Sequence, residues 1–312
     1  MREKYILGIG AANVDVNGRS RNPLIMKDSN PGKMNLSVGG VTRNVLENLS
    51  RLDLPVRLIT AIGGDPFGQV IKEHCAVCHI DLSAAITVED DVSSTYMAIL
   101  NNDGDMQLAL SDMHVINAVD VNELKKRDEI IRNAALITFD PCLAEETMKY
   151  LTETYGEEIP LFCDPVSTSY ARRLKPYLKN IHTLKPNRLE LSVLADHPVD
   201  TEEDLLEACR IVIEKGVKRL FVSMGRKGCL YYDCEGNSIL KAGKPVDNVV
   251  SASGAGDAFT AGIIYGYYHG FDIPTTLDYA LASGSLALLS SGANNPELSV
   301  DKLKEIIRED TK

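Results

Sequence analysis

The sequence predicts an α/β protein in which helices cover both faces of a mostly parallel sheet. Short apolar runs such as Y-I-L-G-I-G (5–10) and A-L-I-T-F-D (135–140) alternate with amphipathic stretches along nearly the whole chain. Strand, helix and strand in series favour a parallel sheet that is buried on both sides. Since no linker rich in Gly, Pro or Ser divides the chain, we expect residues 1–312 to form a single domain.

The elements can be assigned in order along the chain. Apolar runs predict strands at 5–10, 56–63, 135–140, 160–165, 181–187 and 219–225, and helical spacing predicts helices at 43–52, 145–155 and 202–216. Two regions, at about 13–38 and 93–115, break the alternation. The second contains N-N-D-G-D between two β-like runs, which is a hairpin signal. We expect both regions to pair into a small antiparallel flap, a lid that would keep water from a reacting phosphoryl group.

Composition and charge exclude several classes of partner. Hydrophobic residues make up 44% of the chain and charged residues 25%, which is ordinary for a soluble globular protein. The net charge of −11 argues against general binding of nucleic acid, which requires a basic face. The apolar stretch at the N-terminus is too short for a signal peptide, and no run approaches the ~18 apolar residues of a membrane span. Seven irregularly spaced cysteines then favour reduced thiols in a cytoplasmic protein that binds no membrane.

One cysteine cluster resembles a metal or haem motif. H-C-A-V-C-H, from His74 to His79, contains the C-x-x-C-H string of c-type haem attachment and several zinc donors. Donors on one helical turn cannot all converge on a single ion, and the surrounding apolar residues have helical spacing. Buried thiols also behave as small hydrophobes. We therefore expect an ordinary helix here rather than a metal site.

Polar residues follow several of the predicted strands. Ligands of open α/β sheets bind beyond the carboxyl ends of the strands. At these ends we expect Asp15, Asp65, Asp140, Asp164, Asn187 and the turn Ser223-Met224-Gly225. An Asp followed by Pro, as at three of these ends, is also common turn chemistry. A turn role becomes less favoured when several such groups must share one edge.

Glycine-rich segments narrow the search for a ligand site. G-I-G-A-A-N (8–13) lacks the third glycine and the following helix of a dinucleotide site, and the chain has no Walker sequence. V-G-G-V-T-R-N (38–44) opens a predicted helix. S-A-S-G-A-G-D-A-F-T-A-G (251–262) leads into a helix that is apolar nearly all round, so its positive N-terminal end is buried. Asp257 stands in that first turn, although a carboxylate there would repel a phosphate.

Taken together, these segments resemble the ribokinase-like (PfkB) family of sugar and nucleoside kinases. The likeness covers essentially the whole chain and lies in N-x-D at Asn13–Asp15, G-G-x-x-x-N at Gly39–Asn44, L-K-P-N-x-x-E at Leu184–Glu190, S-M-G-x-x-G at Ser223–Gly228 and G-A-G-D-x-F-x-A-G at Gly254–Gly262. It implies a three-layer α/β/α sandwich with a small β-flap, and an ATP-dependent phosphotransferase. D-S-N-P-G-K (28–33), S-D-M (111–113) and N-N-P-E-L-S (294–299) are similar to segments of the pseudouridine kinases within that family.

The resemblance also implies roles for individual residues. Asp257 would take the proton of the acceptor hydroxyl, beside an anion hole formed by Gly254, Ala255 and Gly256. The sugar would be held by Asn13, Asp15, Gly39, Gly40, Asn44 and Asp140. ATP would lie along Asn187, Ser223, Gly225, Gly228, Gly254 and Gly256, and Asn187 and Glu190 would hold Mg²⁺ through water. Ser251 and Ser253, where the family more often has D-T-T, are candidates for holding a monovalent cation such as K⁺.

The acceptor and the assembly are less directly implied. Ser29, Asn30, Arg43 and Thr95 lie on or beside the flap, and we expect some of them to read the edge of a uracil base. Transfer to the 5′-hydroxyl of pseudouridine is the leading hypothesis. Alternatives are a kinase for another nucleoside or sugar, such as inosine, cytidine or ribose, and a non-catalytic sugar-binding regulator of the same fold. Flap hairpins can pair across subunits, so we expect a homodimer.

Overall fold

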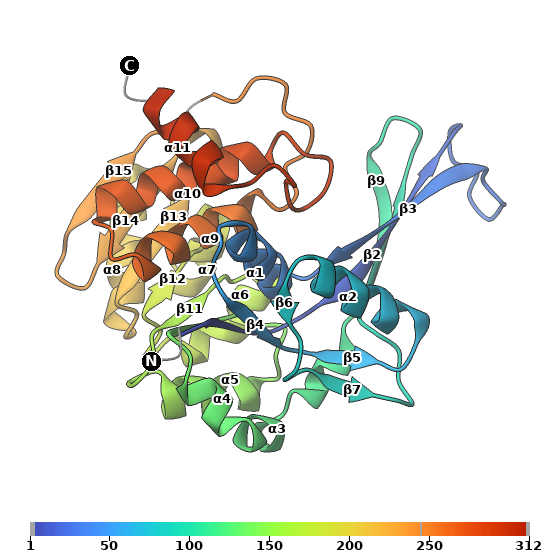
Figure 1. Cartoon of the computed structure of the whole chain (residues 1–312). Coiled ribbons are helices and arrows are strands. Elements are labelled where there is room, and N and C mark those ends of the chain that lie inside the picture. The colour runs from blue at the N-terminus through green and yellow to red at the C-terminus, as the bar shows by residue number, and fades with distance from the viewer. Residues whose placement is uncertain (1–3, 244, 310–312) are drawn as a thin grey trace.

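The computed structural model describes residues 4–243 and 245–309, which build a nine-stranded sheet between two layers of helices (Figure 1). The strand order is β15-β14-β13-β12-β11-β10-β1-β4-β6. The strands are β1 (Ile6–Ile9), β4 (Val56–Ile59), β6 (Ile80–Asp81), β10 (Leu136–Phe139), β11 (Leu161–Cys163), β12 (Thr183–Leu184), β13 (Arg219–Ser223), β14 (Cys229–Asp233) and β15 (Ser238–Lys241). All pairs from β6 to β13 are parallel, and β14 and β15 add an antiparallel hairpin at one edge. The predicted α/β class is confirmed.

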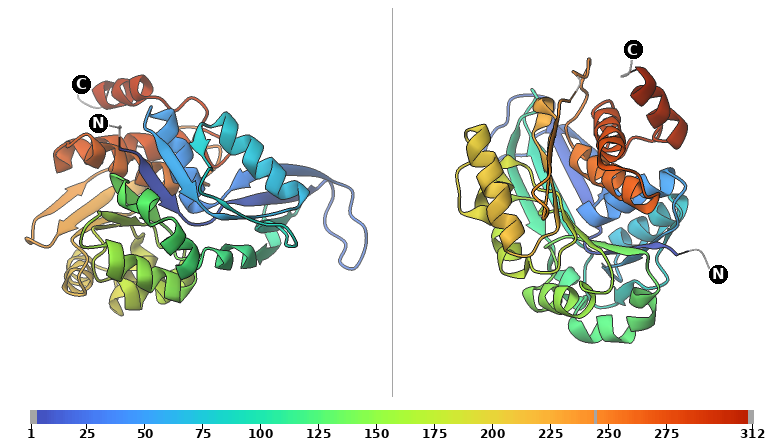
Figure 2. Two further views of the ribbon diagram at one scale, coloured as in Figure 1. Left: turned by 60° about the horizontal axis from the view of Figure 1, so that its bottom comes forward. Right: turned by 90° about the vertical axis from the view of Figure 1, so that its left-hand side faces the viewer.

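Helices cover both faces of this sheet, as the views in Figure 2 show. One layer contains α3 (Val121–Lys126), α4 (Asp128–Arg132), α5 (Glu145–Tyr155), α6 (Thr168–Leu174), α7 (Arg188–Ala195) and α8 (Glu202–Glu214). The other contains α1 (Val41–Arg51), α2 (Pro66–Val77), α9 (Ala255–Tyr268), α10 (Ile273–Ala287) and α11 (Val300–Glu309). Among the described residues, no helix combines the length and the apolar character needed to span a membrane.

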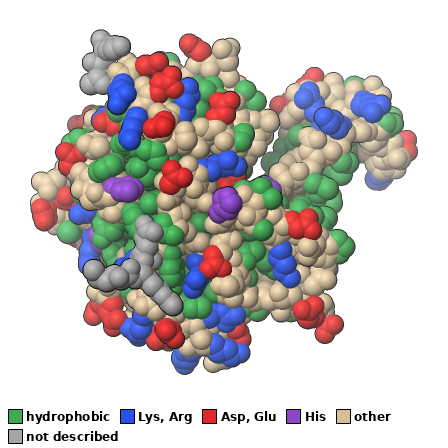
Figure 3. Space-filling view, viewed as in Figure 1, with side chains coloured by type: hydrophobic (Ala, Val, Ile, Leu, Met, Phe, Trp, Pro, Cys, Tyr) green, Lys and Arg blue, Asp and Glu red, His purple; other side chains and the backbone are tan. Residues whose placement is uncertain are grey.

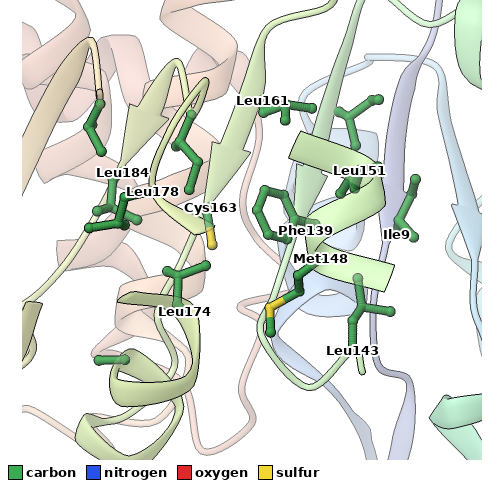
Figure 4. Packing of buried hydrophobic residues seen from close by; sticks show 14 of the residues in the cluster. Ile9, Phe139, Leu143, Met148, Leu151, Leu161, Cys163, Leu174, Leu178 and Leu184 are labelled. Atoms are coloured by element: carbon green, nitrogen blue, oxygen red, sulfur yellow. The ribbon is translucent and has the colours of Figure 1, made fainter. Parts of the chain in front are cut away.

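The side chains of the central strands alternate between two hydrophobic cores. In β1, Ile6 belongs to the core under α1 and α9, whereas Leu7 and Ile9 belong to the core under α5. Figure 4 shows Ile9 and Phe139 packed beside Leu151 of α5. Both faces of each strand are buried, which explains why the sequence shows near-continuous apolar runs rather than alternation.

A second sheet of four strands forms the flap, which stands out from the rest of the surface in Figure 3. Its order is β3 (Gly32–Gly39), β2 (Asn13–Ser20), β8 (Thr95–Leu100) and β9 (Met106–Asp112). The outer pairs are antiparallel hairpins, but the central pair β2–β8 is parallel. The expectation that the flap is purely antiparallel is therefore wrong. The first strand of each hairpin, β2 or β8, runs outward from the body of the protein, and these two strands lie side by side. A short sheet of β5 (Ala61–Gly63) and β7 (Ile86–Val88) is seen below the flap in Figure 1.

The register of the flap divides it into a polar and an apolar face. Asp15 stands beside Ser37 and Tyr96, whereas the next residue, Val16, stands beside Leu36 and Met97. The apolar flap face carries exposed side chains on three strands: Met34, Leu36, Met97, Leu108 and Leu110. Nearer the body, the same face is buried in the core that includes α2. Only the outer half of the apolar flap face is open to solvent.

Candidate active site

Helix α9 begins in the glycine turn and is buried along most of its length. Gly254 has a φ of +75°, and a Cβ on it would lie 1.7 Å from the carbonyl oxygen of Ala293, so only glycine fits. Residues Asp257 to Gly266 are all buried. The first-turn N–H groups of a helix have no partner within the helix, and no side chain of the described residues caps this end. The positive end of α9 is thus available to an anion.

Asp257 points from this first turn toward helix α1. Its Oδ2 accepts a hydrogen bond of 2.8 Å from Nδ2 of Asn44, and only 9% of the residue is exposed. Burial and the nearby Asp164 carboxylate raise the pKa of Asp257 to about 7, although Asn44 and Lys185 oppose that shift. The carboxylate therefore does not cap its own helix. Its pKa suits a group that accepts a proton near neutral pH.

Lys185 adds a positive charge beside the glycine turn. Its Nζ lies 2.7 Å from Oδ2 of the buried Asp164, and a Cβ on Gly256 would lie 3.0 Å from the same Nζ. Burial alone would lower the pKa of Lys185, but Asp164 and more weakly Glu190 and Asp257 raise it. We did not predict a role for this ammonium group from the sequence. The available signal was that Asp164 and Lys185 each follow a strand by one residue, and β11 and β12 are neighbours in the sheet.

The start of α1 and the first flap strand form the opposite wall. Gly40 has a φ of +102°, and a Cβ on it would lie 2.3 Å from the carbonyl oxygen of Ala11; a Cβ on Gly39 would lie 2.4 Å from Oδ2 of Asp15. Nδ2 of Asn13 donates a 2.7 Å hydrogen bond to Oδ1 of Asp15, whose pKa is raised by burial. The predicted sugar-binding residues brought together here are Asn13, Asp15, Gly39, Gly40 and Asn44. They face the α9 start across the Asn44–Asp257 bond.

Asn187 and Glu190 lie together at the start of α7. They form a reciprocal capping box: Asn187 Oδ1 accepts from the Glu190 N–H at 2.9 Å, and Glu190 Oε2 accepts from the Asn187 N–H at 2.8 Å. Burial and the Asp164 charge raise the pKa of Glu190. Asn187 also pairs with Ser223 as an isolated bridge. The oxygen atoms of Asn187 and Glu190 therefore lie beside the turn that follows β13.

The turn from Ser223 to Gly228 borders a groove. Gly225 and Gly228 have φ values of +58° and +91°, and a Cβ on Gly228 would lie 2.0 Å from the carbonyl oxygen of Lys241. A cavity of about 340 Å³ lies between Arg226 of this turn and residues 245–249. Beyond that loop, Ser251 Oγ accepts a 3.1 Å hydrogen bond from the Ser253 N–H. Binding of a monovalent cation at Ser251 and Ser253 stays a prediction.

Asp140 serves the fold rather than a ligand. It has no exposed surface, and its Oδ2 accepts from the N–H of Ala11 at 3.1 Å and from Oγ1 and the N–H of Thr42 at 2.6 and 3.3 Å. Its Oδ1 accepts from the Cys142 N–H. This carboxylate ties together the ends of β1 and β10 and the start of α1. The expected contact with the sugar is corrected, because the lone pairs are already used inside the protein. Asp65 likewise caps α2.

Arg43 is also buried away from the ligand side. Its exposed fraction is 0%, and its guanidinium binds Glu47, the carbonyl oxygen of Val38 and Oδ1 of Asn44. The expectation that Arg43 reads a base is therefore wrong for its side chain. Helical periodicity explains the difference, since neighbouring helix positions point about 100° apart and only Asn44 faces Asp257.

The remaining residues expected to contact the base lie elsewhere on the flap. Ser29 and Asn30 belong to the loop beyond Ser20, roughly 17 Å of strand away from Asp15. The Asn30 side chain closes this loop by bonding Ile25. Thr95 stands beside Val14 and so lies on the apolar side. Within one chain, these three side chains are not placed to contact a sugar at Asp15. Tyr96 shares the face of Asp15, and strand alternation could have identified it.

The cysteine motif lies where α2 ends. Donor atoms of Glu47, His74 and Cys78 lie within 4.8 Å of one another. Both oxygens of Glu47 are bound by guanidinium groups, one by Arg43 and the other by Arg51. Burial raises the pKa of the Cys78 thiol to about 11. The donor atoms of this cluster are therefore bound within the protein, and the positive charges of Arg43 and Arg51 lie where a metal cation would have to bind.

Comparisons with known proteins find similar sequences and folds over nearly the whole chain. A model of the pfkB family of carbohydrate kinases matches residues 3–300. The pseudouridine kinase of Escherichia coli K12 is 34% identical over 309 residues, covering 98% of each chain. A solved carbohydrate kinase from Agrobacterium tumefaciens has a TM-score of 0.87 at 27% identity and covers 98% and 97% of the two chains. A solved E. coli chain in complex with ATP and Mg²⁺ has a TM-score of 0.83 at 19% identity, covering 98% and 100%, which speaks for the fold alone.

The fold and these matches define a phosphotransferase whose acceptor is a hydroxyl group. A family model over nearly the whole chain and a relative above 30% identity with nearly complete mutual coverage lead to the same assignment. The chain belongs to the pfkB family of carbohydrate kinases, and the resemblance to this family seen in the sequence is confirmed.

Proposed function

We propose that this protein transfers the γ-phosphoryl group of ATP to the 5′-hydroxyl of pseudouridine. The observation that carries the proposal is Asp257, a buried carboxylate at the open positive end of α9 that is held by Asn44 opposite the Asp15 wall. Support for the acceptor comes from the E. coli pseudouridine kinase, which is similar over the full length of both chains. Pseudouridine also carries ribose hydroxyls, from which the Asp15 carboxylate can accept hydrogen bonds.

The protein's own residues divide the reaction into two tasks. Asp257 accepts the proton of the 5′-hydroxyl as its oxygen attacks the γ-phosphorus, and a pKa of about 7 leaves a large fraction of the base ionised at neutral pH. The N–H groups of the Gly254–Asp257 turn and the Lys185 ammonium stabilise the charge on the transferred group. Holding the base and these donors one residue apart aligns the hydroxyl with the phosphorus.

The donor set near α7 fits a magnesium ion. Asp164 and Glu190 are two buried carboxylates beside one ammonium group, Lys185, which pairs with Asp164; burial and the Asp164 charge raise the pKa of Glu190. The oxygen atoms of these carboxylates and of the Asn187 amide suit a hard cation that keeps part of its hydration shell, and the Lys185 ammonium beside them is already paired with Asp164. Asn187 and Glu190 would hold Mg²⁺ through water. When bound, it would neutralise phosphate charge.

A panel of acceptors tests the proposal. With ATP and Mg²⁺, we expect kcat/KM for pseudouridine to exceed the values for uridine, inosine, cytidine and ribose, measured by coupled release of ADP. Robust turnover of ribose with none of pseudouridine would overturn the acceptor assignment while keeping the kinase. No ADP release with any acceptor, together with binding of a nucleoside, would instead favour a regulator of the same fold.

We also propose that two copies associate through the apolar flap face. Leu36 and Leu110 are 62% and 65% exposed, and the register places them on the same side of the sheet. A second copy offers the same apolar surface and buries both. Light scattering should give a dimer for the wild type and a monomer for Leu36→Lys/Leu110→Lys. Leu240→Lys is the control, since Leu240 is an exposed leucine on β15. A monomeric wild type would contradict the proposal.

A single domain over residues 1–312 and a cytoplasmic location stay predictions.

A further inference from the structure

A buried polar network connects the end of α2 with the catalytic carboxylate. Arg43 is the largest fully buried side chain of the described residues. Its Nη2 binds Glu47 and lies 2.7 Å from Nδ1 of His74, while its Nη1 donates to Asn44 Oδ1 at 2.7 Å. Asn44 Nδ2 in turn donates to Asp257 Oδ2 at 2.8 Å. Arg43 therefore reaches Asp257 through one intervening side chain.

The chemistry of the arginine determines which way the Asn44 amide faces. A guanidinium group has only donors, whereas an asparagine side chain has an acceptor oxygen and a donor NH₂ group. The oxygen must face Arg43, so the NH₂ group faces Asp257. The opposite orientation would place NH₂ against guanidinium and oxygen against carboxylate, leaving buried groups unpaired at both contacts. The Asn44 backbone is fixed as well, because Asn294 Nδ2 donates to its carbonyl oxygen at 2.9 Å.

We propose that Arg43 is a positioning residue for the catalytic base: its donor-only guanidinium orients the Asn44 amide so that Asn44 donates a hydrogen bond to Asp257. This inference rests on the proposed role of Asp257. Arg43 itself touches neither the base nor the expected position of a substrate. Its anchors are Glu47, the Val38 carbonyl oxygen and His74.

The effect of Arg43 on the pKa of Asp257 can be separated from the effects of the other neighbours of Asp257. The charged groups that face Asp257 are Asp164 and Asp140, which raise its pKa, and Lys185, which lowers it. These three residues follow β11, β10 and β12, and the hydrogen bonds and ion pair found for Arg43 involve none of them. The Asn44 hydrogen bond favours the ionised carboxylate. If Asn44 no longer donates, the pKa of Asp257 rises further.

The acid side of the pH profile is the measurement that reports this. We expect Arg43→Gln and Arg43→Met to move the acid limb of kcat/KM upward by about one pH unit, roughly a tenfold loss well below neutral pH. Gln can turn either its oxygen or its NH₂ group to Asn44 and so does not enforce the orientation. Arg43→Lys keeps a donor-only group, so its acid limb should stay in place while its Tm falls with the lost bonds to Glu47 and His74.

A double-mutant cycle and a matched control complete the test. Asn44→Ala should shift the limb by itself, and adding Arg43→Gln should shift it no further, since both changes remove one interaction. Arg51→Met is the control, because Arg51 also binds Glu47 but does not contact Asn44; its limb should match the wild type.

Two results overturn the role of Arg43. One is a wild-type limb in both Arg43→Gln and Arg43→Met, and the other is a shift that adds fully to that of Asn44→Ala. If the acid limb of kcat/KM does not move in Asn44→Ala either, or if it persists in Asp257→Asn, the result would instead contradict the proposal that Asp257 is the base. Melting curves accompany every variant, and if Arg43→Met does not fold, the Arg43→Gln and Arg43→Lys pair decides.

Discussion

Helices α1 and α9 begin alike but use their positive ends differently. Each starts after a glycine with positive φ, Gly40 at +102° and Gly254 at +75°, and in neither case does the capping residue offer a side chain. At α1, the Asp140 carboxylate accepts from the N–H of Thr42. At α9, the only acidic side chain of the first turn, Asp257, is turned to Asn44 instead.

This difference separates a helix start that is bound within the fold, at α1, from the one that we propose to be catalytic, at α9. The protein supplies its own anion to α1, so that end is neutralised and bound within the fold. It leaves the first-turn N–H groups of α9 without such a partner among the described residues, and Lys185 lies beside them. A glycine-rich segment before a buried helix therefore indicates a close approach of the backbone. Whether a ligand or the protein fills the space depends on the other residues nearby.

The strongest way to break the comparison is to remove the base at α9. Asp257→Asn should lower kcat by ~10²–10⁴-fold or more, because the acceptor hydroxyl loses its proton acceptor. The KM for the acceptor should change little, since Asp15 and the α1 wall remain. Steady-state kinetics with nucleoside binding by calorimetry would check this. A variant that turns over near the wild-type rate would mean that α9 is no more catalytic than α1.

Gly254→Ala tests the geometry of the same turn. The new Cβ would meet Ala293 at 1.7 Å and require a left-handed backbone, so the N–H groups of the turn must shift. We expect kcat to fall by ~10²–10³-fold, the cost of one misplaced oxyanion donor. Gly270→Ala is the matched control, with a φ of +68° but no atom within 4 Å of the new Cβ. Equal losses in the two variants would point to backbone strain alone.

The pH dependence sharpens the assignment of the base. The folded-state pKa of Asp257 is raised to about 7, and in the proposed mechanism the ionised form is the active one. Activity should therefore rise through about pH 7 and fall tenfold for each pH unit below it. The residual activity of Asp257→Asn should lack this limb. A limb that persists unchanged in that variant would belong to another group.

Asp140→Asn should have the smallest effect on turnover. An amide has a single acceptor oxygen, so it can accept from Ala11 and Thr42 or from the Cys142 N–H but not from both sides, and we expect the free energy of unfolding to fall by about 1–3 kcal/mol. The kcat of the folded enzyme should stay within a few-fold of the wild type. Urea titration and kinetics would check both values. A raised KM for the acceptor at unchanged stability would return Asp140 to the substrate site.

Much of the fold followed from local patterns. The apolar runs identified the strands at 5–10, 135–140 and 219–225, and the glycine motifs identified the starts of α1 and α9. The direction of pairing within the flap did not follow, because a hairpin signal describes one turn and says nothing about which hairpin lies beside it. The outer half of the apolar flap face became visible only once the register was known.

The site residues divide along the same line. Asp257 and Asn44 belong to motifs whose spacing is local, and they meet across 213 positions of sequence. Arg43 stands next to Asn44 in sequence but points elsewhere, and the assignment of its side chain required the Glu47 and His74 contacts. Lys185 could be related to Asp164 only through adjacent strands.

The sequence by itself determined the kinds of element, the sheet class and the two glycine-opened helices, because periodicity and backbone freedom are properties of neighbouring residues. The tertiary structure decided which carboxylates are bound within the fold and which face the proposed active site. Asp140 and Asp257 both follow apolar runs or glycine turns, and only the donors brought to them from distant segments distinguish them. Burial and hydrogen bonding depend on packing in three dimensions, and no local pattern records the partner.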